Sequence, residues 1–276
     1  IQYFEGGFLG VDIFFVISGY LMTLLLDKKL NHKSILEFYF RRIKRLLPAL
    51  IFVVFISLIL GFLLISEESL ERVGKTTLSS IFFVSNFYFW REWGYFDLYS
   101  LNKPLLHTWS LSLEMQFYIA FPIFLLVINN LFKKIHIIYK LIFLFLLSIL
   151  LTEFLINERK IAAFYLLPFR VSEFLIGSIG YYYEKKYNTL NLQKSYLFII
   201  SFILIIFFIL SYDKNIKFPG LNTFLPCLIT LFLILDKESY LSKIVLQNKI
   251  ILFIGNISYS LFLIHWPLFV YYRFYK

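Results

Sequence analysis

Long apolar runs alternate with short charged segments along the whole chain. A helix needs about 20 mostly apolar residues to cross a bilayer, whereas a strand of a membrane barrel needs only about 10, with alternating polarity. The runs follow the helical pattern, so we expect an all-α protein, a polytopic transmembrane bundle with about eight or nine helices in this chain. No soluble domain interrupts them, so residues 1–276 are expected to form a single integral-membrane domain. The expected helices cover residues 8–26, 47–65, 113–129, 140–157, 164–183, 196–211, 221–235 and 251–272.

A shorter apolar run at 78–90 leaves the topology open. It is too short to span a bilayer comfortably, which is typical of a re-entrant or interfacial segment. Lys and Arg collect in cytoplasmic loops, so the basic segment 27–46 is expected inside the cell and the acidic segment 66–77 outside. If 78–90 does not cross, the basic loops 133–140 and 184–187 lie inside and the HTWS segment (107–110) faces outward; if it crosses, every later loop inverts. The distribution of Lys and Arg favours the first arrangement only slightly.

The composition agrees with a membrane protein. Hydrophobic residues make up 60% of the chain and charged residues 16%, far from the average of soluble domains. The net charge of +10 is explained by the positive residues of cytoplasmic loops, so nucleic-acid binding is not expected. Cys227 is the only cysteine, which excludes an internal disulfide and argues against redox or thiolate-metal chemistry.

Polar side chains stand at the start of one apolar run, LLHTWSLSLEMQFYIAFP (105–122). His107, Ser110, Glu114 and Tyr118 are three or four residues apart, which puts them on one face of a helix. A carboxylate that faces lipid is costly, so this face is expected to look into protein or a wet cavity. Glu114 and His107 are therefore candidates for catalytic proton transfer. The structural alternative is a hydroxyl side chain that caps the helix, with Glu114 interacting with the helix dipole.

A basic cluster precedes the second expected span, in FYFRRIKRLLP (38–48). Arg41, Arg42 and Arg45 lie within about one turn of helix. Guanidinium groups bind phosphate bidentately, so the cluster favours a cytoplasmic ligand that carries phosphates. A plain topology signal and a site for anionic lipid headgroups are the competing explanations.

Two other apolar runs contain charged residues. Asp12 stands near the entry of the first span, either in a functional role or as an interfacial acid that favours a helix N-terminus. Arg170 and Glu173 lie inside the run 164–183, and their spacing of three allows an ion pair within one helix.

The last apolar run carries Ser258 and His265, and Pro267 is expected to kink or end its helix. A lone histidine such as His265 is more often a packing residue that forms hydrogen bonds than a catalyst. Sequence signatures of a nucleophile elbow, a phosphate-binding loop, a zinc-protease helix and a dinucleotide site are all absent from the sequence. Metal dependence is therefore not indicated.

Five motifs, taken together and in this order, resemble the successive signatures of the acyltransferase family 3 membrane proteins, which include bacterial O-antigen and exopolysaccharide O-acetylases. The resemblance extends over essentially the whole chain. The motifs are GVDIFFVISGYLMT, FYFRRIKRLLPA, LLHTWSLSLEMQFYIAFP, FRVSEFLIGSIG and GNISYSLFLIHWPL.

The resemblance implies a multi-pass enzyme of the bacterial inner membrane with about ten helices. Such an enzyme takes an acyl group, usually acetyl from cytoplasmic acetyl-CoA, and delivers it to a sugar hydroxyl on the outer side of that membrane. The implied acceptor is a lipopolysaccharide O-antigen, an exopolysaccharide or a lipid-linked glycan. The implied partners are acyl-CoA as donor substrate, the glycan and membrane lipids, with no bound cofactor and no metal.

The resemblance also assigns residues by position. Arg41, Arg42 and Arg45 match the basic motif thought to meet the phosphates of CoA, and Glu114 matches a polar residue of the acyl-transfer tunnel. With Glu114 and His107 as the catalytic candidates, the residues expected to line the tunnel or position the substrate are Asp12, Ser110, Tyr118, Arg170, Glu173, Ser258 and His265.

One departure from the family concerns the ends of the chain. Family members normally carry a first helix with an arginine and a histidine that is taken to be the catalytic base or acyl carrier, and here it would precede Ile1. The last helix would follow Lys276, so we expect a chain truncated at both ends or an inactive remnant. A different class remains an alternative, namely a secondary transporter of a sugar or lipid-linked intermediate with Glu114 and Arg170 as coupling charges.

Overall fold

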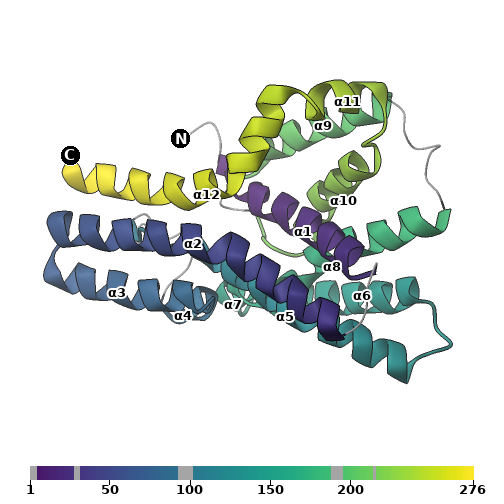
Figure 1. The fold of residues 1–276 in the computed structure, drawn as a ribbon, viewed down its shortest axis with the longest axis horizontal. Helices are drawn as coiled ribbons and strands as arrows, with labels where there is room; N and C mark the ends of the chain where they lie inside the picture. The colour runs from purple at the N-terminus through teal and green to yellow at the C-terminus, as the bar shows by residue number, and fades with distance from the viewer. Residues whose placement is uncertain (1–4, 28–31, 93–101, 188–194, 214–215) are drawn as a thin grey trace. The chain divides into compact units, whose positions relative to one another are not determined.

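The computed structural model describes residues 5–27, 32–92, 102–187, 195–213 and 216–276. Within these ranges the chain forms helices joined by turns and loops, without any strand (Figure 1). A short 3₁₀ helix, Glu5–Phe8, precedes α1 (Leu9–Asp27) and α2 (His32–Leu64). The helices that follow are α3 (Glu67–Ile81), α4 (Ser85–Glu92), α5 (Thr108–Leu131), α6 (Ile137–Leu155), α7 (Lys160–Tyr165), α8 (Leu167–Tyr187), α9 (Ser195–Ser211), α10 (Leu221–Leu235), α11 (Tyr240–Leu246) and α12 (Lys249–Tyr275).

In the described part of the chain, six helical segments are long and apolar enough to cross a membrane. Two further apolar helices, α9 and α10, are shorter. A helix is present at each of the eight ranges expected from hydrophobicity, and the prediction of an all-α membrane-type protein is confirmed. The six segments are Gly6–Asp27, Ile35–Leu64, Thr108–Leu131, Ile137–Leu155, Lys160–Tyr187 and Lys249–Tyr275.

Pro48 and Pro267 lie inside helices, and one predicted helix start is wrong for this reason. The second span was expected to begin at 47, yet α2 begins at His32 and continues through Pro48. The arginine cluster therefore lies on the same continuous helix as the span. Pro267 likewise lies inside α12, which continues to Tyr275 near the predicted end at 272. Of the two expectations for this proline, a kink or a helix end, the helix end is wrong. Proline removes one backbone hydrogen bond from a helix. A long transmembrane helix tolerates that loss, because the turns on either side of the proline and the neighbouring helices hold its backbone in place.

The apolar run at 78–90 is divided between two helices, α3 and α4. Phe83 adopts a left-handed conformation with φ 54°. The N–H of Val84 donates to the carbonyl of Ser79 at 2.8 Å, and the N–H of Phe83 donates to that of Ser80 at 3.1 Å. This is the Schellman pattern that ends helices, here with Phe in the position usually occupied by Gly. With 15 and 8 residues, α3 and α4 are each too short to span a bilayer of about 30 Å.

The described helices divide into two compact units, and α5 and α12 contribute to both. The first unit comprises Ile1–Leu30 and Ala120–Leu252. In it α1 lies along α8, and the rings of Phe15 and Phe174 stack with centroids 4.3 Å apart. The backbones approach closely at Gly19, whose carbonyl accepts a hydrogen bond from Ser178 Oγ at 3.2 Å. Small residues permit such contacts between membrane helices.

The second unit comprises Asn31–Ile119 and Phe253–Lys276. Two tyrosines of α12 donate hydrogen bonds to backbone carbonyls of α2: Tyr259 to Leu46 at 2.8 Å, and Tyr271 to Ser57. Since these bonds lie more than ten residues apart along both helices, they fix the register of α12 on α2. The buried core between them contains Leu50, Val53, Val54, Leu105, Leu111 and Leu263.

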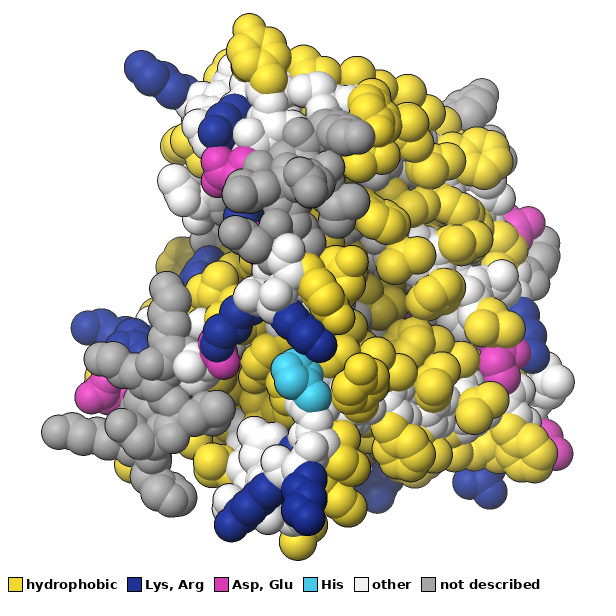
Figure 2. Space-filling model, turned by 90° about the vertical axis from the view of Figure 1, so that its right-hand side faces the viewer, with side chains coloured by type: hydrophobic (Ala, Val, Ile, Leu, Met, Phe, Trp, Pro, Cys, Tyr) yellow, Lys and Arg dark blue, Asp and Glu magenta, His cyan; other side chains and the backbone are white. Residues whose placement is uncertain are grey.

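Large apolar side chains are exposed on most of the long helices. On α2, for example, Phe52, Phe55 and Phe62 are 62%, 61% and 75% exposed. Figure 2 shows many exposed hydrophobic side chains on one face, with most of the visible Lys and Arg on one side of the view. An apolar surface of this extent is typical of helices that face lipid.

Candidate functional site

The polar stripe predicted on α5 begins in a tight turn. The N–H groups of Leu106, Thr108 and Ser110 donate to the carbonyls three residues earlier, and Ser110 Oγ donates to the carbonyl of His107 at 3.0 Å. Through these bonds the chain continues directly into α5. The side chains of the first two turns of α5 are buried. Thr108 and Ser110 thus donate to backbone carbonyls and do not accept an N–H as helix caps would.

Glu114 is buried, with 3% of its surface exposed. Tyr118, one turn further along α5, donates a hydrogen bond to its carboxylate. The ring of Tyr118 in turn lies under the guanidinium of Arg42, with 4.7 Å between the guanidinium carbon and the ring centroid. Arg42 also contacts the ring of Phe38, at 5.4 Å. We call Arg42, Tyr118 and Glu114 the Arg–Tyr–Glu cluster; it joins the basic part of α2 to the predicted catalytic carboxylate.

The other two predicted donor-binding arginines are on the surface of α2. Arg41 and Arg45 are exposed, and Arg41 lies 3.8 Å from Glu37 in a pair of which both members are more than half exposed. A pair with this exposure is weak because water screens it, so it does not occupy the guanidinium permanently. The three arginines therefore differ: Arg42 belongs to the Arg–Tyr–Glu cluster, while Arg41 and Arg45 face outward.

His107 is buried at the start of α5, against α12. Its ring centroid lies 5.3 Å from that of Phe262 and 5.7 Å from that of His265. Burial lowers the pKa of His107 well below its usual range, and the neighbouring His265 contributes in the same direction. His107 is therefore neutral at physiological pH and a weak base in this state, which favours Glu114 as the proton acceptor.

The two predicted residues of α12 are more exposed than the tunnel assignment suggests. The ring Nδ1 of His265 lies 2.6 Å from the carbonyl of Phe262, and Ser258 Oγ donates to the carbonyl of Gly255 at 2.8 Å. Both side chains are thus bonded to their own helix. Of the two, only His265 contacts another predicted site residue, through the ring of His107.

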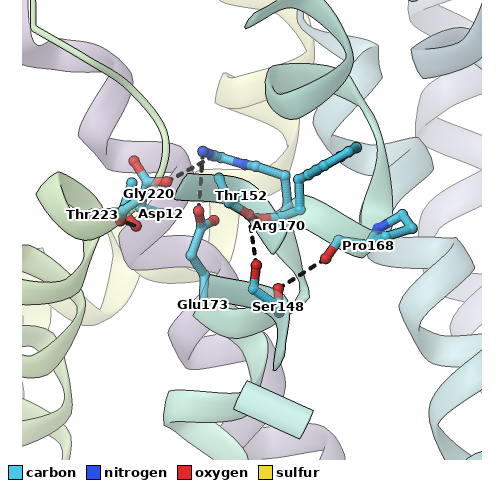
Figure 3. A network of polar contacts seen from close by, with 9 residues as sticks. Asp12, Ser148, Thr152, Pro168, Arg170, Glu173, Gly220 and Thr223 are labelled. Atoms are coloured by element: carbon cyan, nitrogen blue, oxygen red, sulfur yellow. Dashed lines mark hydrogen bonds and ion pairs between the residues drawn. The ribbon is translucent and has the colours of Figure 1, made fainter. Parts of the chain in front are cut away.

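Asp12, Arg170 and Glu173 form a cluster in the first unit (Figure 3). Arg170 Nη2 lies 2.7 Å from Asp12 Oδ1, and Arg170 Nη1 lies 3.0 Å from Glu173 Oε1. The ion pair between Arg170 and Glu173, which their spacing of three residues allows within one helix, is present. Asp12 lies in the first turn of α1, as expected for an acid at a helix N-terminus, and its fully buried side chain also pairs with α8.

The surroundings of this buried cluster hold the arginine in place. The rings of Phe15, Phe164 and Phe218 lie 5.2 to 5.6 Å from its guanidinium carbon. Aromatic faces attract a cation, more strongly where water is excluded. On α6, Ser148 donates a hydrogen bond to the carbonyl of Pro168 at the start of α8 (Figure 3), and Thr152 donates to the carbonyl of the next residue. The cluster is thus rigidly built, and two carboxylates share one guanidinium.

The predicted site residues fall into two groups, one within each compact unit. The Arg–Tyr–Glu cluster, His107, Ser110 and the α12 residues belong to the second unit. Asp12, Arg170 and Glu173 belong to the first unit. The described residues contain no group of three or more His, Cys, Asp or Glu side chains that could hold a metal.

Sequence reasoning missed a second polar stripe on α5. Ser112 Oγ lies 2.8 Å from Ser85 Oγ, and Gln116 and Asn86 exchange amide hydrogen bonds of 2.8 and 3.4 Å. Thr108 belongs to the same stripe through Ser80, at 2.8 Å. The spacing of four residues along α5 was the available signal. These bonds attach α3 and α4 to one face of α5. Glu114 lies on a different face of the same helix.

These features define a membrane-type helical protein with acidic, imidazole and guanidinium groups held inside. A family model described as an acyltransferase domain matches residues 1–276, and the chain belongs to the acyltransferase family 3.

Curated relatives agree with this family. A Staphylococcus aureus (strain COL) protein with the name "Putative O-acetyltransferase" is 36% identical over 96% of this chain and 46% of its own length. The O-acetyltransferase OatA of S. aureus (strain NCTC 8325) is 33% identical over 98% of this chain and 47% of its own length. An uncharacterized protein of Haemophilus influenzae (strain Rd) is 33% identical over 81% of this chain and 96% of its own length. The chain spans about half the length of the two staphylococcal relatives. No solved structure matches it.

Proposed function

We propose that this chain is the membrane part of an O-acyltransferase that moves an acyl group, acetyl in the simplest case, from cytoplasmic acyl-CoA to a hydroxyl of a glycan. The acceptor is a cell-surface or lipid-linked glycan such as a lipopolysaccharide O-antigen or an exopolysaccharide. The protein would act in the bacterial inner membrane. Membership of the acyltransferase family and the O-acetyltransferase relatives support the reaction class.

The observation that carries the proposal is the Arg–Tyr–Glu cluster. Arg42 belongs to a basic stretch at the N-terminal end of a membrane-spanning helix, and Glu114 is a buried carboxylate. Tyr118 contacts both, by its ring on one side and its hydroxyl on the other. The basic stretch proposed to bind the donor and the buried carboxylate proposed to take the proton are therefore linked through one side chain.

We assign binding of the acyl donor to the exposed arginines. Acyl-CoA carries phosphates, and Arg41 and Arg45 present guanidinium groups that bind phosphate bidentately. Arg42 would bind the same donor from the side that faces the protein interior. Its stacking on Tyr118 restricts its orientation there. No cofactor besides the donor substrate is part of the proposal.

The chemical step follows from the buried carboxylate. The acceptor hydroxyl oxygen attacks the carbonyl carbon of the thioester, the bond between that carbon and sulfur breaks, and an oxygen ester forms. Glu114 takes the hydroxyl proton and returns it to the CoA thiolate, so the products are the ester and the free thiol of CoA. His107, neutral and next to the same helix turn, would orient the hydroxyl. Water exclusion in the helical protein limits hydrolysis of the acyl group.

The remaining predicted residues would position substrate or shape the tunnel. Ser110 belongs to the stripe of Glu114, and Ser258 and His265 come from α12 in the same unit. Asp12, Arg170 and Glu173 are buried, with Arg170 paired to both carboxylates, so we assign them to holding α1 against α8.

The test uses cells that express the full-length gene in a strain without it, and measures ester-linked acetyl on surface polysaccharide. Arg42→Ala and Glu114→Gln should abolish the gain in acetylation while membrane abundance is unchanged. Tyr118→Phe keeps the stacked ring and removes the hydroxyl, and should lower the rate about tenfold, the effect of one lost hydrogen bond to a charged group.

The matched control is Lys133→Ala, which removes an exposed cation of the loop before α6. It should leave acetylation at the wild-type level. Unchanged acetylation in both the Arg42 and the Glu114 variants would refute the site, and absence of ester-linked acetyl with the wild-type gene would refute the reaction.

A further inference from the structure

A cavity of about 630 Å³ lies in the second unit, between the ends of several helices. It is lined by Ile65 just after α2, by residues of α3, by Glu92 at the end of α4, by the segment before α5, and by Phe274 near the end of α12. Its volume falls within the range of small-molecule sites. None of the residues predicted from the sequence lines it.

The cavity and the arginine cluster lie toward opposite ends of α2. Arg42 and Ile65 are separated by a continuous helix, and at the helical rise this is roughly 35 Å. The hydrocarbon core of a bilayer is about 30 Å thick. If the arginine end faces the cytoplasm, the cavity therefore opens on the opposite side of the membrane, where the proposed acceptor is found.

Part of the cavity lining is held by a hydrogen-bond network. Lys103 Nζ lies 2.9 Å from Glu92 Oε2, and Tyr88 donates to the same carboxylate. The backbone carbonyl of Lys103 accepts a hydrogen bond from the indole of Trp266 at 2.8 Å. The ammonium and the carboxylate are partly exposed, at 17% and 27%. A polar surface that is fixed before the ligand arrives costs little ordering on binding.

The walls present a mixture of groups that suits a sugar. Arg72 offers donors in a planar fork and Asn102 offers both a donor and an acceptor, and both side chains are exposed. Phe274 adds an apolar ring face that is 36% exposed. A sugar has hydroxyls that donate and accept around its edge and a weakly polar face, so it uses all three kinds of contact.

We propose that this cavity binds a saccharide unit of the glycan acceptor, with Arg72 and Asn102 on its hydroxyls and Phe274 against its ring face. The inference rests on the proposed acyl transfer, since it names where the acceptor of that reaction is held. It places the phosphates of the donor and this one saccharide unit of the acceptor toward opposite ends of α2, while the reacting thioester and hydroxyl meet at Glu114.

The test uses the purified full-length protein with radiolabelled acetyl-CoA and alkali-deacylated surface polysaccharide of the source strain. Arg72→Ala and Phe274→Leu should each raise the polysaccharide concentration for half-maximal transfer about five- to tenfold, as expected for one lost contact. The concentration of acetyl-CoA for half-maximal transfer should stay unchanged, because the donor binds at the other end of the helix.

Two substitutions serve as matched controls. Lys75→Ala removes an exposed cation from the same helix as Arg72, and Tyr275→Leu removes an exposed ring next to Phe274; neither residue lines the cavity. Both should retain the wild-type dependence on polysaccharide. Cavity variants that behave like these controls, or that shift the dependence on acetyl-CoA instead, would overturn the assignment.

A binding measurement separates this inference from the proposed function. Fluorescently labelled, deacylated polysaccharide is titrated with the protein in the absence of acyl donor. Weaker binding of the Arg72 and Phe274 variants alone supports the cavity as the saccharide site, even if the wild type transfers no acetyl and the proposed reaction fails. Equal binding by all variants overturns the cavity, even if transfer by the wild type upholds the reaction.

Discussion

The closest backbone approach between α1 and α8 occurs at two glycines. A Cβ added to Gly19 would lie 1.9 Å from the carbonyl oxygen of Phe174, and one added to Gly177 would lie 2.0 Å from that of Val16. Both obstacles are backbone atoms, which cannot turn aside as the end of a flexible side chain can. Gly19→Ala therefore requires the two helices to separate.

The size of the effect follows from the missing space. A carbon and an oxygen need about 3 Å or more, so the helices would have to move apart by about 1 Å at Gly19. That shift would weaken the stacking of Phe15 on Phe174 and the hydrogen bond from Ser178 to the Gly19 carbonyl. Overpacking of this kind costs about 1–3 kcal/mol, and we expect the upper end because both partners are backbone. The higher helix propensity of alanine offsets about 0.5–1 kcal/mol of this loss in stability.

Thermal stability in detergent micelles measures the difference, with fluorescence-detected size-exclusion chromatography after heating. Gly19→Ala should lower the melting temperature by roughly 4–8 °C, using about 2–4 °C per kcal/mol for a chain of this size. Gly10→Ala is the matched control on the same helix, because a Cβ there meets no atom within 4 Å. It should be neutral or slightly stabilising. A Gly19→Ala protein as stable as the Gly10→Ala protein would refute the close packing.

Two further predictions concern buried charges. Arg170→Ala leaves two carboxylates buried without their cation and should cost about 3–5 kcal/mol, seen as loss of monodisperse protein in size-exclusion chromatography. Glu173→Gln keeps the pair with Asp12 and should fold; equal losses for both variants would contradict the charge arrangement. For His107, whose pKa is lowered by burial, the unfolded chain takes up a proton near pH 6.5 that the folded chain does not, so stability is lost as the pH falls below that value. His107→Gln should flatten the decline in melting temperature between pH 7.5 and 5. A His107→Gln profile identical to that of the wild type would show that this histidine does not titrate differently on unfolding.

The helices themselves were predictable because hydrophobicity acts over a whole span. A run such as 196–211 is apolar at nearly every position, so it forms a helix whatever its neighbours are. The ends were harder to predict. The basic stretch before Pro48 reads as a loop followed by a helix start, yet it continues α2, since one lost hydrogen bond is small against a helix of 33 residues.

In the candidate site, too, some features could be predicted from the sequence and others could not. The spacing of Glu114 and Tyr118 on α5 predicts that they share a face, and they are hydrogen-bonded. That Arg42 stacks on Tyr118 has no signal in the sequence, because the two residues are 76 positions apart and belong to different helices. The cavity beside Lys103 and Glu92 is likewise built from segments whose proximity no local pattern encodes.

Periodicity and hydrophobicity are local, so they sufficed for the all-α class, the positions of the spans and the polar face of α5. The motif order was enough for the family. Which buried charges meet depends on how the helices pack, and packing joins residues that are distant in the chain. Asp12 illustrates this: by its position it reads as an acid at a helix entry, and only the approach of α8 turns it into the partner of Arg170.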